Sequence, residues 1–220
     1  MPRLAERYTV HVMDRRGRGL SADRPGYDIR REGEDVAAVV TAAGRNVFLV
    51  GHSYGALCSL EAALVTDAIG RMVLYEPPAS PPGHDVAGPE LIEALRAAAA
   101  SQEPERILKT FFRGALHLTD EQIDAMRGTA IWRARLAAAP TIVREIENVE
   151  VFDISARLSA ITVPVRLLLG TESPAYFRPA AEAIAKELAD AEIVPLVGQS
   201  HLAINEDPEQ FVEKVVSFRR

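Results

Sequence analysis

The sequence has a single cysteine, Cys58, among 220 residues, which excludes an internal disulfide framework and a zinc site built from cysteines. No apolar run approaches the roughly 20 residues that a membrane-spanning helix needs. The N-terminus has no basic segment followed by an apolar stretch, as a secretory signal would. A formal net charge of -6 leaves no broad basic surface for nucleic acid. These absences predict a cytoplasmic protein without nucleic-acid or membrane partners.

What the sequence does contain is a regular alternation of apolar runs and helical patterns, with 48% hydrophobic residues overall. Apolar runs of strand length occupy residues 8–13, 47–50, 72–75, 163–169 and 192–197, and helical patterns occupy residues 29–43, 56–66, 176–188 and 208–218. Asp207 and Pro208 suit the N-cap and first position of the last helix. The alternation predicts an α/β fold with a mostly parallel sheet and helices on both faces.

The middle of the chain breaks this alternation. A linker rich in proline and glycine covers residues 80–88, and several helical patterns follow as far as about residue 149 without a strand between them. We therefore expect an α/β core from residues 1–79 and 150–220, with residues 80–149 forming a helical lid. The alternative is that these helices only pack on one another and on the core.

A Gly-x-Ser-x-Gly motif, Gly51 to Gly55, lies between a predicted strand and a predicted helix. Such a motif makes a sharp turn that holds the central serine, Ser53, strained and exposed, while glycines allow close approach of the backbone. The start of the following helix offers N–H groups to a developing oxyanion. The motif in this position predicts a nucleophilic serine rather than a simple connecting turn.

His201 lies just after the last predicted strand and before the last helix. Because the carboxyl ends of parallel strands meet at one edge of a sheet, a histidine here can reach a serine that follows another strand. His201 therefore suits the role of general base toward Ser53.

With these residues in place, the chain resembles the α/β-hydrolase fold family, in particular its small bacterial esterase- or peroxidase-like members. The matching stretches are VHVMDRRGRGLS, VFLVGHSYGALCSLEAAL, MVLYEPP, VPVRLLLG and VGQSHLAINEDPEQFVEKVVSF. The resemblance implies that Ser53 attacks a carbonyl, His201 takes and returns the proton, and a carboxylate orients the imidazole. It further implies that the Tyr54 N–H is an oxyanion donor, and that neither a metal nor an organic cofactor is needed.

The acid of this triad departs from the family's pattern. The family usually has an aspartate three residues after the glycine that ends the strand VRLLLG, and here that position is Ser173. Glu76, directly after the strand MVLY, occupies the place that some members use for their acid. Glu172 is one residue before the usual position, and its longer side chain could cover the offset. Both glutamates remain candidates.

The family normally begins with a hairpin and a further strand whose loop supplies a second oxyanion donor, and the sequence has no counterpart of these before residue 8. The chain could be a truncated form of a longer enzyme. We expect that the strand at residues 8–13 pairs directly with the strand at 47–50, or that a second copy completes the sheet edge in a homodimer.

The favoured function is hydrolysis of a small ester, lactone or related acyl substrate through a Ser53 acyl-enzyme. The alternative is a catalytically weak or inactive protein that binds a small ligand. We expect four side chains to line the substrate pocket: His52, Phe111, Phe112 and Trp132. For the arginines at 15, 16 and 18, the resemblance implies a chiefly structural loop, with anion binding as the alternative.

Overall fold

The computed structural model describes residues 2–219. Its centre is a parallel sheet with the strand order β1-β2-β3-β4. The strands are β1 (Val47–His52), β2 (Ile69–Tyr75), β3 (Val165–Gly170) and β4 (Ala191–Leu196). His52 pairs with Tyr75 and Gly170 with Leu196, so neighbouring strands end level with each other. Segments that leave these ends therefore start from one common edge of the sheet.

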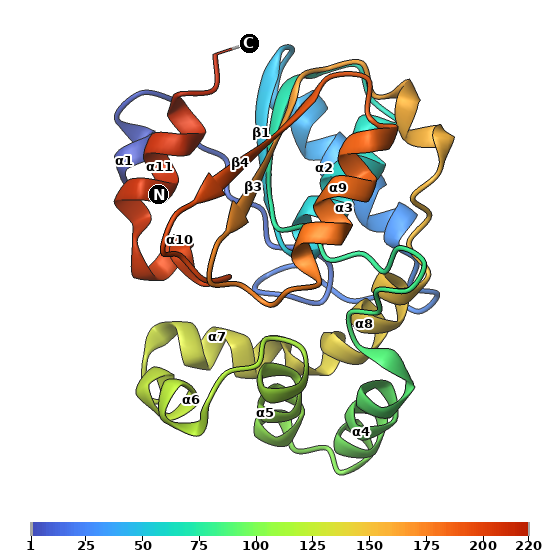
Figure 1. Cartoon of the computed structure of the whole chain (residues 1–220), viewed down its shortest axis with the longest axis vertical. Helices are drawn as coiled ribbons and strands as arrows, with labels where there is room; N and C mark the ends of the chain where they lie inside the picture. The colour runs from blue at the N-terminus through green and yellow to red at the C-terminus, as the bar shows by residue number, and fades with distance from the viewer. Residues whose placement is uncertain (1, 220) are drawn as a thin grey trace.

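Helices cover both faces of this sheet (Figure 1). Side chains of β2 alternate between two apolar clusters: Met72 packs in the cluster with α2 and α3, and Val73 packs in the cluster with α11. One face carries α2 (Ile29–Ala43), α3 (Tyr54–Ala63) and α9 (Phe177–Glu187), and the other carries α1 (Pro2–Ala5) and α11 (Pro208–Val216), which the short α10 (Ala203–Glu206) precedes. The α/β class with a covered parallel sheet is confirmed.

The predicted N-cap of the last helix is also confirmed. The Asp207 carboxylate accepts a hydrogen bond from the Gln210 N–H (3.0 Å), with Pro208 at the first helical position. α2 begins in the same way, because the Asp28 carboxylate accepts from the Arg30 N–H (2.8 Å). These local contacts explain why the helix boundaries could be predicted from sequence.

Residues 80–149 fold as helices and contain no strand in the structure described. The helices are α4 (Gly88–Ala100), α5 (Pro104–Gly114), α6 (Asp120–Met126), α7 (Ala130–Ala138) and α8 (Ile142–Glu150), with the 3₁₀ turn Ala139–Thr141 before α8 and a second turn, Ala156–Ala160, before β3. They gather at one end of the molecule (Figure 1). Leu95, Leu108 and Ile123 lie in their own apolar cluster, so this layer has a partly independent core.

The strand predicted at residues 8–13 is not formed, which corrects that expectation. Tyr8 packs its ring edgewise on Phe48 of β1 (6.0 Å between centroids). Val10 packs against the α11 side of the sheet, whereas Met13 packs against the α2 and α3 side. The segment thus crosses the sheet edge from face to face and cannot run alongside β1. β1 is the edge strand among the described residues, and completion of this edge by a second copy stays a prediction.

Candidate active site

Ser53 occupies the sharp turn between β1 and α3. Its backbone has φ 54° and ψ -131°, which is a strained conformation for a residue that is not glycine. The turn is fixed by the Ser53 N–H, which donates to the Tyr75 carbonyl of the neighbouring strand (2.8 Å). Tyr54 is the first residue of α3, and the first amides of a helix have no acceptor within it. The Tyr54 N–H therefore lies next to the serine without a helical partner.

Of the two motif glycines, Gly51 is the one that the packing requires. A Cβ added at Gly51 would lie 2.6 Å from Ser59 Oγ and 2.8 Å from Ala56 Cα, so α3 could not approach the strand. A Cβ added at Gly55 would meet nothing within 4 Å. The close approach that the motif predicts is thus found at its first glycine.

His201 is held between two rings in the loop after β4. The imidazole stacks on Phe177 (4.6 Å, 16°) and lies 4.6 Å from the His52 ring, which itself stacks on Tyr75. The His52 Nε2–H donates to the His201 carbonyl (3.1 Å), and the Tyr75 hydroxyl donates to the carbonyl of Ser200. These contacts fix both the backbone and the ring plane of His201.

Glu76 is the carboxylate that meets His201. His201 Nδ1 donates to Glu76 Oε2 (2.6 Å), and the Gly170 N–H donates to Glu76 Oε1 (2.7 Å). Glu76 is fully buried and has φ 47°, so this second residue of the site is also strained. With Nδ1 bound to the carboxylate, Nε2 of His201 is the nitrogen left to accept a proton.

The other candidate acid lies elsewhere. Glu172 is exposed, and its carboxylate accepts only from the neighbouring Thr171 hydroxyl (3.4 Å) in the part of the chain that is described. Ser173, at the position where the family has its aspartate, has a buried hydroxyl close enough to the Glu76 carboxylate to help lower its pKa. The geometry therefore pairs His201 with Glu76 and not with Glu172.

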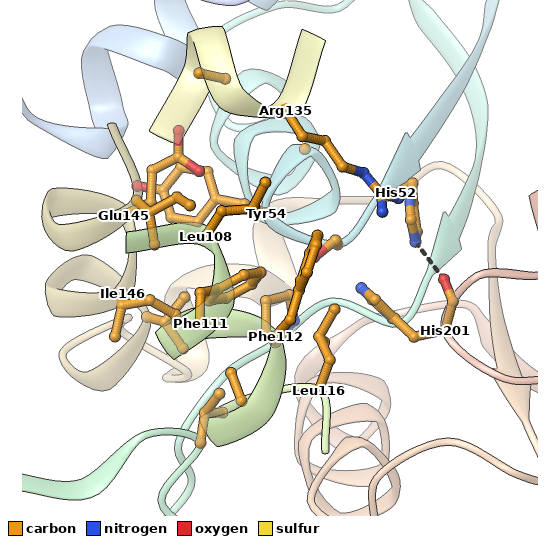
Figure 2. Close-up of a pocket in the computed structure, with 18 of the residues that line it drawn as sticks. His52, Tyr54, Leu108, Phe111, Phe112, Leu116, Arg135, Glu145, Ile146 and His201 are labelled. Carbon is orange, nitrogen blue, oxygen red and sulfur yellow. Dashed lines mark hydrogen bonds between the residues drawn. The ribbon is translucent and has the colours of Figure 1, made fainter. Parts of the chain in front are cut away.

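A cavity of about 300 Å³ opens between the carboxyl ends of the strands and the helices of residues 80–149 (Figure 2). Ser53 and His201 both line it, although no hydrogen bond joins the two side chains among the described residues. The wall opposite them is mostly apolar and comes chiefly from α5 and α8: Leu108, Phe111, Phe112, Leu116, Ile146 and Val149. His52, Phe111 and Phe112 line the cavity, as the sequence predicts for a substrate pocket.

Trp132 is placed differently from the prediction. It is 5% exposed, does not line the cavity, and packs behind Phe112 with 6.4 Å between ring centroids. The physical reason is that the apolar face of α7 turns into the cluster shared by the helices rather than toward Ser53. Trp132 therefore supports the Phe112 ring, which forms part of the cavity wall.

Burial shapes the proton affinities at this site. Burial lowers the pKa of His201 to about 3, with the positive charge of Arg135 acting in the same direction. Burial also lowers the pKa of His52 to about 3, and the neighbouring His201 contributes to the same shift. In contrast, burial raises the pKa of Glu76 to about 7, although the Ser173 hydroxyl and the Gly170 N–H oppose this. Both histidines are therefore neutral at pH 7, the state in which His201 can act as a base.

Two arginines of the glycine-rich loop line the far side of the cavity and pair with carboxylates. Arg15 donates to Glu32 (2.6 Å) and Glu145 (3.0 Å), and Arg18 donates to Glu145 (2.7 Å). Burial alone would raise the pKa of Glu145, but the two guanidiniums hold it below its ordinary value. The cluster joins the loop, α2 and α8, which agrees with the structural role that the resemblance implies for this loop.

Arg135 of α7 is a charged residue of the cavity lining that was not predicted from the sequence. It lies in the helical middle of the chain with no motif around it, so no sequence signal distinguishes it from the other arginines there. Glu145 was missed for the same reason. Only the packing of α7 and α8 over the sheet edge brings these residues to the cavity.

Comparisons with known proteins agree with this geometry. A family model described as the alpha/beta hydrolase family matches residues 1–214. The chain belongs to the alpha/beta hydrolase family. A solved structure of an alpha/beta hydrolase from Sphaerobacter thermophilus is 28% identical, with a TM-score of 0.75 over 92% of this chain and 79% of that one. The parallel sheet and the helices that cover it therefore belong to a known hydrolase fold.

Two curated relatives are also similar. N-formylmaleamate deformylase from Pseudomonas putida is 30% identical over 174 residues, which is 76% of this chain and 62% of that protein. The 2-(acetamidomethylene)succinate hydrolase from Mesorhizobium japonicum is 40% identical over 77 residues, which is 34% of this chain and 27% of that protein. The matched region thus spans less than two thirds of the length of either relative.

Within residues 2–219, no group of three or more His, Cys, Asp or Glu side chains is arranged to hold a metal ion. No helix in that same range is long and apolar enough to span a membrane.

Proposed function

We propose that this protein is a serine hydrolase in which Ser53 is the nucleophile, His201 the general base and Glu76 the acid. The observation that carries the proposal is the 2.6 Å contact between His201 Nδ1 and the buried Glu76, in a cavity that Ser53 also lines. This contact leaves Nε2 of His201 free to accept a proton on the side of the cavity. Strained backbone at both Ser53 and Glu76 supports a functional rather than a structural origin of the arrangement.

The reaction follows from these positions. Ser53 Oγ attacks the acyl carbon while its proton passes to His201 Nε2, and the developing oxyanion is stabilised by the Tyr54 N–H. His201 then gives the proton to the leaving oxygen or nitrogen, which departs and leaves the acyl group on Ser53. Water attacks this acyl-enzyme with His201 again as base, and the acid product leaves with Ser53 restored.

The substrate we propose is a small ester, lactone or related acyl compound. The cavity volume of about 300 Å³ suits a small molecule rather than a long chain. The names of the two curated relatives denote acyl–nitrogen substrates, so amides belong to the same proposed class. In this proposal α4 to α8 act as a lid, since α5 and α8 supply the wall opposite Ser53.

Covalent labelling tests the nucleophile directly. Incubation of the native protein with a fluorophosphonate is expected to place a single adduct on Ser53, mapped by mass spectrometry of the digested protein, because only this serine faces the cavity with His201. Protein unfolded before addition of the probe is expected to remain unlabelled. A native, folded sample without an adduct on Ser53 would contradict the proposal and favour the small-ligand-binding alternative.

The pH dependence of hydrolysis tests the role of the hydrogen-bonded pair Glu76–His201. Acidification through about pH 7 is expected to lower kcat/KM, because burial raises the pKa of Glu76 to about 7 and the first proton to enter the Glu76–His201 pair removes the active state. The profile is measured from pH 5 to 9 with one ester substrate. An activity that stays constant down to pH 5 would show that this pair does not control the reaction.

A further inference from the structure

Three arginines line the cavity, and their partners differ. Arg15 and Arg18 form ion pairs with Glu145, and Arg15 forms a second one with Glu32. Arg135 has no ion pair with any carboxylate among the described residues. Its contacts are a hydrogen bond from Nη1 to the Met126 sulfur (3.0 Å) and the Phe112 ring, 5.2 Å from its Cζ. Arg135 is therefore the one of the three without an ion-pair partner in the described structure, although the negative charge of Glu206 acts on it from a distance.

The direction of the Arg135 side chain also bears on its role in the cavity. Figure 2 shows its side chain directed from α7 toward His52, on the side of the cavity where His201 lies. The charge acts on both rings, since it helps to lower the pKa of His52 and of His201. Burial also lowers the pKa of Arg135 itself, and the charge of Glu206 only partly opposes this, which marks a guanidinium that has lost much of its water.

A partly desolvated cation without an ion-pair partner costs free energy that a structural role does not recover. The contact with Phe112 offsets only part of this cost, because a cation–π contact is weaker than a charge-assisted hydrogen bond. A planar guanidinium presents paired N–H donors that match a carboxylate. An anion bound in the cavity would supply the missing partner.

We propose that Arg135 binds a carboxylate of the substrate, so that the substrate class is a small acyl compound bearing a free carboxylate, such as a half-ester or half-amide of a short dicarboxylic acid. The inference rests on the proposed function for the reacting group, but the carboxylate site stands on the geometry of Arg135. The substrate must be short, because Arg135 and the Ser53–His201 pair line the same cavity of about 300 Å³. Arg135 thus selects the substrate and orients its acyl group toward Ser53.

Paired substrates test this assignment. Monoethyl succinate and ethyl 4-methylpentanoate have similar shape, but an isopropyl group replaces the carboxylate in the second, and acid release is followed in a pH-stat. Arg135→Gln is expected to lower kcat/KM for the half-ester roughly 10- to 100-fold more than kcat/KM for the neutral ester, because any effect of the lost charge on His201 is common to both substrates. The matched control is Arg133→Gln on the same helix, whose exposed side chain donates to the Gly128 carbonyl and does not line the cavity. It should change neither rate.

An equal loss of activity on both esters would overturn the assignment, because it would indicate a structural role for Arg135. A wild-type protein with a higher kcat/KM for the neutral ester than for the half-ester would also overturn the assignment.

A binding measurement separates this inference from the proposed function. Calorimetric titration of succinate into Ser53→Ala and into Ser53→Ala/Arg135→Gln needs no catalysis. Binding that is weakened roughly 10- to 100-fold by the second substitution supports the carboxylate site even if neither ester is hydrolysed. Equal binding, or none, to the two variants overturns it even where Ser53 is labelled and neutral esters are hydrolysed.

Discussion

Replacing Ser53 by alanine is expected to lower kcat for ester hydrolysis by a factor on the order of 10⁴ to 10⁶, since no acyl-enzyme can form without the hydroxyl. A residual rate above that of water is expected from the Tyr54 N–H and from substrate binding alone. The substitution should not disturb the fold, because the structure gives the Ser53 side chain no hydrogen bond among the described residues. Single-turnover kinetics and thermal unfolding of the same preparation check both expectations.

Ser59→Ala is the matched control for this loss. Ser59 lies on α3 one turn beyond the elbow, and its hydroxyl donates to the Gly55 carbonyl (2.8 Å) rather than into the cavity. The same hydroxyl group is removed six residues further along the chain, so a rate within about threefold of wild type is expected. If Ser53→Ala retained the rate of Ser59→Ala, the nucleophile would have to be another group.

Glu76→Gln is expected to lower kcat by a factor of roughly 10³ to 10⁴. The amide cannot hold the negative charge that stabilises the imidazolium of His201, and its NH₂ group would favour the wrong tautomer of the ring. The contact with the Gly170 N–H can persist through the amide oxygen, so the change tests the charge rather than the packing. Steady-state kinetics give kcat, and circular dichroism checks that the variant is folded.

Glu172→Gln distinguishes the two glutamates that the sequence alone leaves open. Its side chain is exposed and makes no contact with His201 in the described structure, so the same chemical change should leave kcat within about twofold. A large loss at Glu172 together with a small loss at Glu76 would reverse the assignment of the acid.

The arrangement of strands and helices could be predicted because its determinants are local. The apolar runs that become β1 to β4 and the capping contacts of α2 and α11 are each visible within a few residues of sequence. The same local evidence failed at residues 8–13. An apolar, β-branched run has the propensity for a strand, but a strand also needs a neighbour in register, and this segment crosses the sheet edge instead.

The sequence also could not choose between Glu76 and Glu172. Both follow strands that end at the same edge of the sheet, so both satisfy the topological requirement. The difference lies in the direction of each side chain: Glu76 turns inward at a positive φ and meets His201 and Gly170, whereas Glu172 turns outward. Side-chain direction in a loop depends on contacts from distant segments.

The sequence by itself determined the parallel α/β class, the strained turn at Ser53 and the placement of His201 after the last strand, since each follows from short-range pattern and chain order. Only the tertiary structure decided that Glu76 is the partner of His201, that Trp132 packs behind Phe112 outside the cavity, and that Arg135 enters the cavity without an ion-pair partner among the residues described. The first depends on how the segments after β2, β3 and β4 meet, and the other two on how residues 80–149 pack over the carboxyl ends of the strands. Contacts between segments so far apart in the chain leave no periodic signal in the sequence.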